Sequence, residues 1–307
     1  MRHHEVILDR PPAEPTAVPQ SERDVEAWQE ANRTWWNRHP MRYDWKTGVQ
    51  HAEFTPEFYR EIDRRFFSDA HAYMPWRWLP FEHLIDFTRL AGMDVLEVGV
   101  GMGSHAQLLA SHSRSFVGID LTDYAVRATS ERLKVFDIDG RILQMDAEHM
   151  EFEDDSFDFI WSWGVIHHSA NTPAILGEMR RVLRPGGRAV VMVYHRNPWN
   201  YYVVRGLLGG LVTGELWRTR SIHSSVQSVT DGALARFYTC KEWAQLCSRY
   251  FSVAEIEVYG SKAELIPLPG GRLKSRLLAI VPDGVGRFFT NELQVGSFLV
   301  STLENPP

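Results

Sequence analysis

The stretch that decides the fold is Asp94 to Ala110, with the sequence DVLEVGVGMGSHAQLLA. Asp94 to Val98 is a short run of Val and Leu with one internal carboxylate, which is typical of a strand buried on both faces of a parallel sheet. Three glycines follow between Gly99 and Gly103, and they allow the backbone to turn sharply and to lie against a ligand. A helical pattern begins at Ser104, and the first N–H groups of a helix have no partner within it. The stretch therefore predicts a strand, a ligand-binding turn and a helix.

Outward from this stretch, strand patterns alternate with helical patterns. Strands are expected at residues 94–98, 116–120, 141–145, 157–162, 188–194, 251–259 and 296–303, and helices at 81–90, 123–136, 173–183 and 240–250. Such alternation produces right-handed crossovers and a parallel sheet with helices on both faces. We therefore predict an α/β fold with a doubly wound, mostly parallel sheet, whose last strand pairs antiparallel at the edge.

The rest of the chain predicts additions to this sheet. Residues 1–20 contain four prolines and little apolar content, which indicates a disordered tail. Residues 21–79 predict a helical and aromatic cap, with helices that begin after Ser21 and Thr55. Residues 80–307 form the main domain, interrupted by a Gly-rich, partly helical insertion at 197–231. The aromatic connector that includes Tyr43 and Trp45 either seals the cap onto the domain or covers a ligand.

Composition limits the classes of function. The 307 residues carry a net charge of -6, which argues against a nucleic-acid partner because such proteins usually present a basic face. Cys240 and Cys247 would lie about 10 Å apart on one helix, beyond disulfide reach, which fits a reducing cytoplasm. No secretory signal is visible, and the apolar run 203–212 is too short to span a membrane. We therefore expect a cytoplasmic protein without stable membrane insertion.

Acidic residues end the second and third expected strands, where a doubly wound sheet binds its ligand. Asp120 follows the glycines by about 20 residues, the separation at which a carboxylate can accept hydrogen bonds from ribose hydroxyls. Asp146 is placed to accept from an adenine amino group. The glycines also partly match the dinucleotide fingerprint G-x-G-x-x-A, which would indicate a nicotinamide or flavin enzyme. The register disfavours that alternative, because counting from Gly99 puts the third position of the fingerprint on Ser104.

Between Pro80 and Tyr194 the chain resembles the class I S-adenosylmethionine-dependent methyltransferases. The segments that carry the resemblance are VLEVGVGMGSH, GIDLT, MDAEHMEFEDDSFDFIWSWGVIHH and EMRRVLRPGGRAVVMVYH, in the family's order. The resemblance implies a Rossmann-like, seven-stranded methyltransferase sheet with S-adenosylmethionine as cofactor. It implies that the methionine part contacts Glu97, Gly99, Gly101 and Gly103, that the ribose contacts Asp120 with Leu121 nearby, that the adenine contacts Asp146 and Ala147, and that Trp163 flanks the methyl group.

The motifs GVIHH and RPGG resemble those of the branch of this family that methylates small molecules. That branch includes ubiquinone, menaquinone and natural-product methyltransferases. Methyl transfer requires the acceptor to be held in line with the methyl group, and it requires a base only when the acceptor must lose a proton. His167 and His168 are the first candidates for that base, although either could instead hold the cofactor loop by a structural hydrogen bond. Tyr194 and His195 are second candidates. Tyr238 is a third candidate for the base, by analogy with the motif around it.

We therefore predict a methyltransferase that acts on a small, hydrophobic or aromatic metabolite, in keeping with bacterial secondary metabolism. Tyr43, Trp45 and Tyr238 are the expected acceptor contacts. No H-x-x-x-H or C-x-x-C spacing indicates a metal site. Two alternatives stay open: an S-adenosylmethionine enzyme of another reaction, such as methylation coupled to cyclisation, and a non-catalytic scaffold with the same fold. Aromatic residues in the N-terminal region are compatible with a homo-oligomer.

Overall fold

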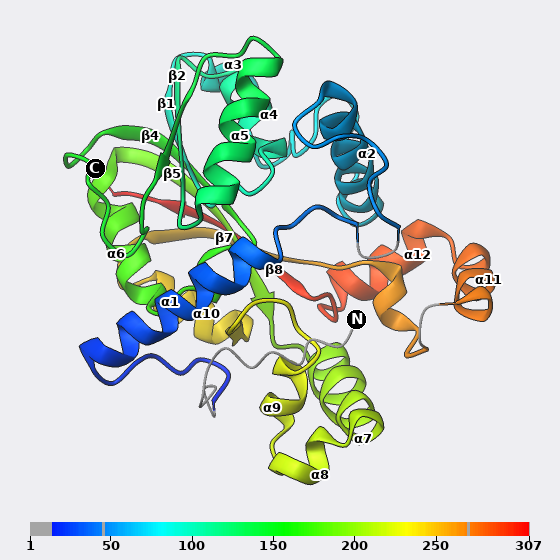
Figure 1. Cartoon of the computed structure of the whole chain (residues 1–307). Coiled ribbons are helices and arrows are strands. Elements are labelled where there is room, and N and C mark those ends of the chain that lie inside the picture. The colour runs from blue at the N-terminus through cyan, green and yellow to red at the C-terminus, as the bar shows by residue number, and fades with distance from the viewer. Residues whose placement is uncertain (1–13, 45–46, 269–270, 307) are drawn as a thin grey trace.

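A computed structural model describes residues 14–44, 47–268 and 271–306, and its centre is a sheet of eight strands (Figure 1). Its order is β3-β2-β1-β4-β5-β8-β7, with β6 paired to β5. The strands are β1 (Asp94–Val98), β2 (Ser115–Asp120), β3 (Arg141–Gln144), β4 (Phe157–Trp163), β5 (Leu183–His195), β6 (Phe237–Tyr238), β7 (Ser252–Tyr259) and β8 (Phe298–Glu304). The pairs among β1 to β6 are parallel, whereas β8 is antiparallel to both of its neighbours. The doubly wound α/β prediction is confirmed, with the two-residue β6 as an addition.

The position of β8 corrects one expectation, because β8 lies between β5 and β7 and the edge strand is β7. The five residues from Leu299 to Leu303 are all buried, so both faces of β8 are covered. Much of β7 is exposed or only half-buried, as an edge strand is. A strand with both faces covered lies inside a sheet, and the burial of β8 agrees with its central position.

The connecting helices are α4 (Ser104–Ala110), α5 (Asp123–Val135), α6 (Thr172–Val182) and α10 (Cys240–Cys247). Only α3 (Phe87–Leu90) remains of the helix expected at residues 81–90. Phe81 has a φ of 61°, outside the helical range. Asp86 caps α3 by accepting hydrogen bonds from the backbone of Thr88 and Arg89, which fixes the start of the helix there.

The cap contains two helices that begin where the sequence predicts. Ser21 accepts a hydrogen bond from the backbone of Asp24 at the start of α1 (Glu22–Arg38), and Thr55 caps α2 (Pro56–Tyr73). The N-terminal segment 14–20 lies against the domain, since Ala17 accepts a hydrogen bond from Arg236 at 2.7 Å. The remainder of the expected tail, residues 1–13, lies outside the described residues, as does Trp45.

Helices beyond the sheet form two groups (Figure 1). The insertion contains η2 (Pro198–Gly209), a π-helix, followed by α7 (Gly210–Thr213), α8 (Glu215–Thr219) and α9 (Ile222–Gln227). The segment between β7 and β8 contains η3 (Lys262–Leu265), α11 (Arg272–Ile280), α12 (Asp283–Arg287) and η4 (Phe288–Glu292). None of the helices in the described ranges combines the length and the apolar character needed to cross a bilayer.

Two apolar clusters hold the sheet, one on each face. Alternate residues of β4 enter different clusters: Ile160 packs into the first, whereas Phe159 and Trp161 pack into the second. This alternation follows from the period of two along a strand. The second cluster includes Phe66 of α2 and Phe81, so the cap is fixed to the sheet by apolar packing.

Candidate active site

The glycine turn between β1 and α4 is packed on one side and open on the other. Gly99 has a φ of 83°, and a Cβ there would lie 2.2 Å from a methyl carbon of Val165. Gly101 has a φ of 51°, yet no atom of the described residues lies within 4 Å of where its Cβ would be. Gly101 therefore borders open space, and a ligand can approach the backbone there.

Arg132 of α5 holds this turn from behind. Its guanidinium is buried, donates to the carbonyl of Met102 at 3.1 Å and forms an ion pair with Asp63 of α2. Asp63 also accepts a hydrogen bond from the hydroxyl of Ser104 at 2.7 Å. A buried charge is tolerated only when it is paired and hydrogen-bonded, and this network meets that condition. Sequence reasoning missed it, because no local pattern links α2 to α5.

Glu97 and His105 form the buried wall beside the turn. Glu97 is 1% exposed, one of its oxygens lies 3.8 Å from Nδ1 of His105, and the other has no hydrogen-bond partner in the described structure. Burial raises the pKa of Glu97 well above its usual value. Burial and the charge of Arg132 lower the pKa of His105 to about 3. The imidazole of His105 is therefore neutral near pH 7, and sequence reasoning overlooked this residue although it occupies the first turn of the helix after the glycines.

Aromatic rings enclose this wall. The indole of Trp163 stacks on Trp161 at a centroid distance of 5.2 Å, and the ring of Phe81 lies 4.9 Å from Trp163. His105 lies 5.1 Å from Phe81 and 5.2 Å from Trp161. Trp163 thus ends β4 on the side of the sheet that carries Glu97 and His105, and its expected role beside the methyl group stays a prediction.

Asp120 lies at the carboxyl end of β2 next to the open side of the turn. One of its oxygens accepts from the backbone N–H of Gly101 at 3.2 Å, and the other accepts from the backbone and hydroxyl of Thr122 at 3.0 and 2.8 Å. Burial raises the pKa of Asp120, and these hydrogen bonds oppose the rise. Leu121 follows at the same edge and is half-buried. The carboxylate is therefore oriented by two backbone groups toward the glycine turn.

Asp146 is in contact with the cap. Its carboxylate accepts from the side chain of Gln29 on α1 at 2.8 Å and from the backbone of Glu148 at 2.9 Å. The Gln29 side chain also accepts from the backbone of Ala170 at 3.2 Å. Ala147 follows Asp146 and is half-buried. Helix α1 is therefore tied to the end of β3 and to the segment after β4.

His168 is held as a neutral imidazole with one nitrogen free to accept a proton. Its Nδ1 lies 2.8 Å from the carbonyl oxygen of Leu234, and because a carbonyl can only accept, Nδ1 carries the proton. Nε2 is buried and has no hydrogen-bond partner among the described residues. Burial lowers the pKa of His168, against the raising effect of Asp231. The ring of Trp36 on α1 lies 5.0 Å from the imidazole, and Asn32 donates to the carbonyl of His168.

His167 and Tyr194 pack beside His168. The His167 ring lies 4.1 Å from that of His168 and 4.0 Å from that of Tyr194, and neither of its nitrogens has a hydrogen-bond partner in the described ranges. Burial, followed by the neighbouring imidazole, lowers the pKa of His167 well below its usual value. The Tyr194 hydroxyl donates to Asp231 at 2.9 Å, and burial and that carboxylate raise its pKa. Tyr194 therefore keeps its proton.

Three other expected site residues have different surroundings. His195 places Nδ1 2.8 Å from the carbonyl of Gly296 and Nε2 3.8 Å from the sulfur of Cys240, so it turns away from Tyr194 as neighbours on a strand do. Tyr238 packs in the first core cluster, with its ring 5.0 Å from Trp243.

Tyr43 lies 5.1 Å from the ring of Phe66 and within electrostatic reach of Asp231, which together with burial raises its pKa. Trp45 lies outside the described residues.

The structure brings His167, His168 and Tyr194 together at the ends of β4 and β5. Among the described residues, no group of three or more His, Cys, Asp and Glu side chains is arranged to hold a metal ion.

Part of the chain is similar in sequence to known methyltransferases. Residues 96–191 match a family model described as a methyltransferase domain. The chain is 33% identical over 126 residues to the methyltransferase GfsG of Streptomyces halstedii, covering 40% of this chain and 42% of that protein. It is 33% identical over 101 residues to the 27-O-demethylrifamycin SV methyltransferase of Amycolatopsis mediterranei, covering 32% and 37%. The chain thus spans about two fifths of the length of these curated relatives.

Among solved structures, geranyl diphosphate C-methyltransferase from Streptomyces coelicolor A3(2) is similar in fold, with a TM-score of 0.56 at 13% identity over 94% of this chain and 100% of that one. That protein was crystallised with S-adenosyl-L-homocysteine, geranyl diphosphate and Mg²⁺.

Proposed function

We propose that this chain, which carries a class I S-adenosylmethionine-dependent methyltransferase domain at residues 96–191, methylates a small, hydrophobic or aromatic metabolite in bacterial secondary metabolism. The cofactor is S-adenosylmethionine, which supplies a methyl group activated by a sulfonium. The similarity to the 27-O-demethylrifamycin SV methyltransferase, whose name gives a rifamycin as the molecule that it methylates, supports the choice of a natural-product acceptor.

One observation carries the proposal: the donor turn and the segment with the histidines are in direct contact. A Cβ on Gly99 would collide with Val165, and Val165 directly precedes η1 (Ile166–His168). The turn that would hold the donor therefore lies against the residues that would act on the acceptor. Holding two reactants side by side is the main contribution that a protein makes to an in-line displacement.

The residues around the turn fit the cofactor. Gly101 borders open space, and the buried oxygen of Glu97 and Nε2 of His105 have no hydrogen-bond partner among the described residues. Buried polar atoms without partners are costly, so these positions favour a polar ligand. Glu97 and the glycine turn would hold the methionine part and Asp120 the ribose. Asp146 with Ala147 would hold the adenine.

His168 is the base that the geometry favours. Its Nδ1 proton is committed to Leu234, so Nε2 presents a lone pair and can take a proton from an acceptor hydroxyl, amine or activated carbon. Tyr194 donates its hydroxyl hydrogen bond to Asp231 and is therefore held in place. Its ring packs against the neighbouring His167. The enclosing helix α1, with Trp36 over the imidazole, excludes water from this space.

Two measurements test the proposal. Calorimetry with S-adenosylmethionine is expected to show one binding site, and a failure to bind would refute the cofactor assignment for this chain. Incubation with methyl-labelled cofactor and candidate metabolites, followed by mass spectrometry, is expected to identify a labelled product. Binding without any labelled product across such acceptors would favour a non-catalytic scaffold instead.

The base is tested by His168→Gln, which is expected to lower turnover of the identified acceptor by about 10²- to 10⁴-fold while leaving cofactor binding intact. His112→Gln is the matched control, because the Nδ1 of His112 also lies 2.8 Å from a backbone carbonyl, that of Leu108 on α4. Turnover that survives both His168→Gln and His167→Ala would rule out a histidine base.

A further inference from the structure

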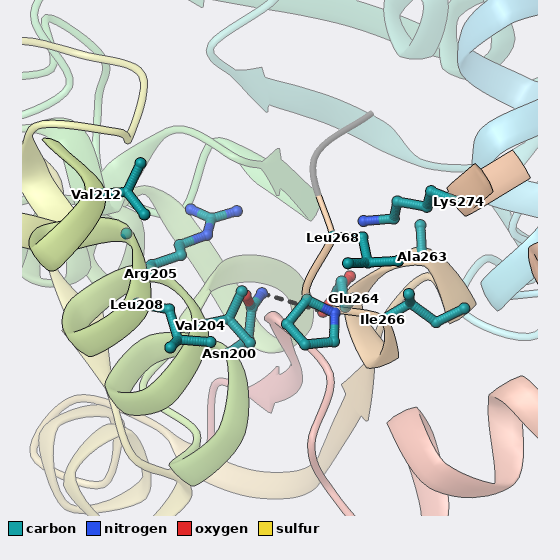
Figure 2. A pocket seen from close by; sticks show the side chains of 12 residues that line it. Asn200, Val204, Arg205, Leu208, Val212, Ala263, Glu264, Ile266, Leu268 and Lys274 are labelled. Atoms are coloured by element: carbon teal, nitrogen blue, oxygen red, sulfur yellow. Dashed lines mark hydrogen bonds between the residues drawn. The ribbon is translucent and has the colours of Figure 1, made fainter. Parts of the chain in front are cut away.

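A hollow of about 420 Å³ lies between the insertion and the segment that follows β7 (Figure 2). One wall consists of η2 and α7, from which Val204, Leu208 and Val212 face the hollow at intervals of four residues. The opposite wall includes Ile266 and Leu268. Both walls are therefore mainly aliphatic, and an apolar ligand of moderate size matches such a space.

Two cations enter this hollow from opposite walls. Figure 2 shows the guanidinium of Arg205 on η2 and the ammonium of Lys274 on α11 pointing toward one another across the space. In the part of the chain that the structure describes, neither side chain forms a hydrogen bond or a salt bridge. Cations on an aliphatic wall lose hydration and gain little from their surroundings, so an anionic group between them would be stabilised.

The floor of the hollow carries one carboxylate, Glu264, whose charge acts on both cations. Glu264 accepts hydrogen bonds from the hydroxyl of Ser297 at 2.6 Å and from the backbone of Ser261 at 2.8 Å. Burial raises the pKa of Glu264, which favours its uncharged form. Even when Glu264 is ionised, two cations face one carboxylate. The hollow therefore keeps an excess of positive charge.

A series of neighbouring residues links the floor of the hollow to the cluster that contains the proposed base. Ser297, which donates to the floor, directly precedes Phe298, whose ring lies 6.4 Å from that of Tyr194. The Tyr194 ring in turn lies 4.0 Å from that of His167. The charge of Arg205 acts on both Glu264 and Tyr194, lowering the pKa of each against the larger effect of burial. Arg205 is therefore within electrostatic reach of both the floor of the hollow and Tyr194.

We infer that this hollow binds an amphiphilic acceptor, with an aliphatic body between the two walls and a carboxylate, phosphate or sulfate group paired with Arg205 and Lys274. The inference rests on the proposed function, since it names the class of molecule that receives the methyl group. The anionic amphiphile can come from two sources, a free metabolite or a lipid headgroup in a bilayer. The experiment separates them.

The first experiment is calorimetric titration of the full chain with dodecyl phosphate and with dodecanol, both below their aggregation concentrations and without cofactor. Dodecyl phosphate is expected to bind at least about tenfold more tightly, the equivalent of about 1.4 kcal/mol. Arg205→Gln and Lys274→Gln are each expected to reduce this preference to about threefold or less. Arg272→Gln is the control, because Arg272 is an exposed cation at the start of the same helix, α11, and does not line the hollow.

Equal affinity for the two probes would overturn the inference, and so would an equal loss in Arg272→Gln, which would indicate attraction by the general surface charge. Sedimentation with vesicles of phosphatidylglycerol or of phosphatidylcholine tests the bilayer as the source. Binding to phosphatidylglycerol vesicles that is lost in Arg205→Gln but kept in Arg272→Gln would support the inference with a lipid acceptor. Because none of these titrations needs S-adenosylmethionine or turnover, a failed methyl transfer and a failed acceptor site remain distinguishable.

Discussion

The proposed donor side and the proposed acceptor side of this molecule are built in different ways. The proposed donor side comes from one continuous stretch, Asp94 to Ala110, and from strand ends that the sheet aligns, such as Asp120. The proposed acceptor side is assembled from segments far apart in sequence: α1, the insertion and the residues that line the hollow after β7. On this proposal, backbone geometry fixes the donor, whereas side chains on appended segments select the acceptor.

The largest effect is expected on the donor side, from Gly101→Ala. The new methyl group would occupy the open space beside a backbone with a φ of 51°, so cofactor affinity is expected to fall by about 100-fold, or about 2.7 kcal/mol. Calorimetric titration with S-adenosylmethionine measures this affinity. Gly186→Ala is a matched control, because Gly186 has a φ of 77° and equally open surroundings but lies within β5, away from the glycine turn between β1 and α4. An equal loss in the control would mean that strain and not ligand contact explains the effect.

A second effect is expected on the pH dependence of stability, through His105 in the buried wall that it forms with Glu97. The pKa of His105 is about 3 in the folded protein and about 6.5 in an unfolded chain, so the unfolded state binds more protons below pH 6.5. Stability from this group is therefore present above pH 6.5 and is lost as the pH falls toward 3. Between pH 8 and pH 5 the loss is expected to be about 2 kcal/mol.

His105→Phe removes this titration, so urea unfolding should show the variant losing about 2 kcal/mol less than the wild type over that pH range. His112→Phe, at a half-buried position in the turn after α4, serves as the control and is expected to follow the wild type. If the free energy of unfolding depended on pH in the same way in His105→Phe and in the wild type, the stability of the wall formed by Glu97 and His105 would not depend on a neutral imidazole.

A third effect concerns the helix that links the two sides. Gln29→Ala removes the hydrogen bonds that tie α1 to Asp146 and Ala170, which should cost about 1–2 kcal/mol of local stability. Amide hydrogen exchange across α1 is expected to accelerate by about tenfold. The control is Glu30→Ala on the exposed face of α1, where an ion pair with Arg33 contributes little. Unchanged exchange in Gln29→Ala would mean that apolar packing alone holds the helix.

The smallest effect is expected at His195. Its ring contacts Gly296 and Cys240 on the opposite side of β5 from Tyr194, so His195→Gln should leave turnover unchanged within about twofold. Steady-state kinetics with the identified acceptor measures this. A large loss of turnover would extend the acceptor side to the other face of β5.

Local signals in the sequence predicted most elements of the fold and the donor side of the candidate site. The helix starts after Ser21 and Thr55, the glycine turn and the ends of β2 and β3 all depend on residues that are neighbours in the chain. Interactions across long separations had no such signal. Arg132 and Asp63 are 69 residues apart, and the contact of Phe81 with His105 and Trp163 is possible only once the sheet has formed.

The same reason explains the misplaced elements. The expected helix at residues 81–90 was wrong over its first turn and a half, because tertiary packing holds Phe81 among aromatic rings with a positive φ. The edge position expected for β8 was wrong because chain order does not determine the order of strands in a sheet. The hollow could not be predicted, since its two walls meet only in the folded chain.

The pairing of β6 with the end of β5 has a consequence for how this protein could change over time. Tyr194 pairs with Phe237 and His195 pairs with Tyr238, so the insertion leaves the sheet and returns to it at the same place. The free energy needed to close a loop rises only slowly with its length. The insertion can therefore be lengthened, shortened or exchanged for another without altering the register of the strands. Engineering of acceptor choice is best directed at the insertion, with the glycine turn between β1 and α4 left unchanged.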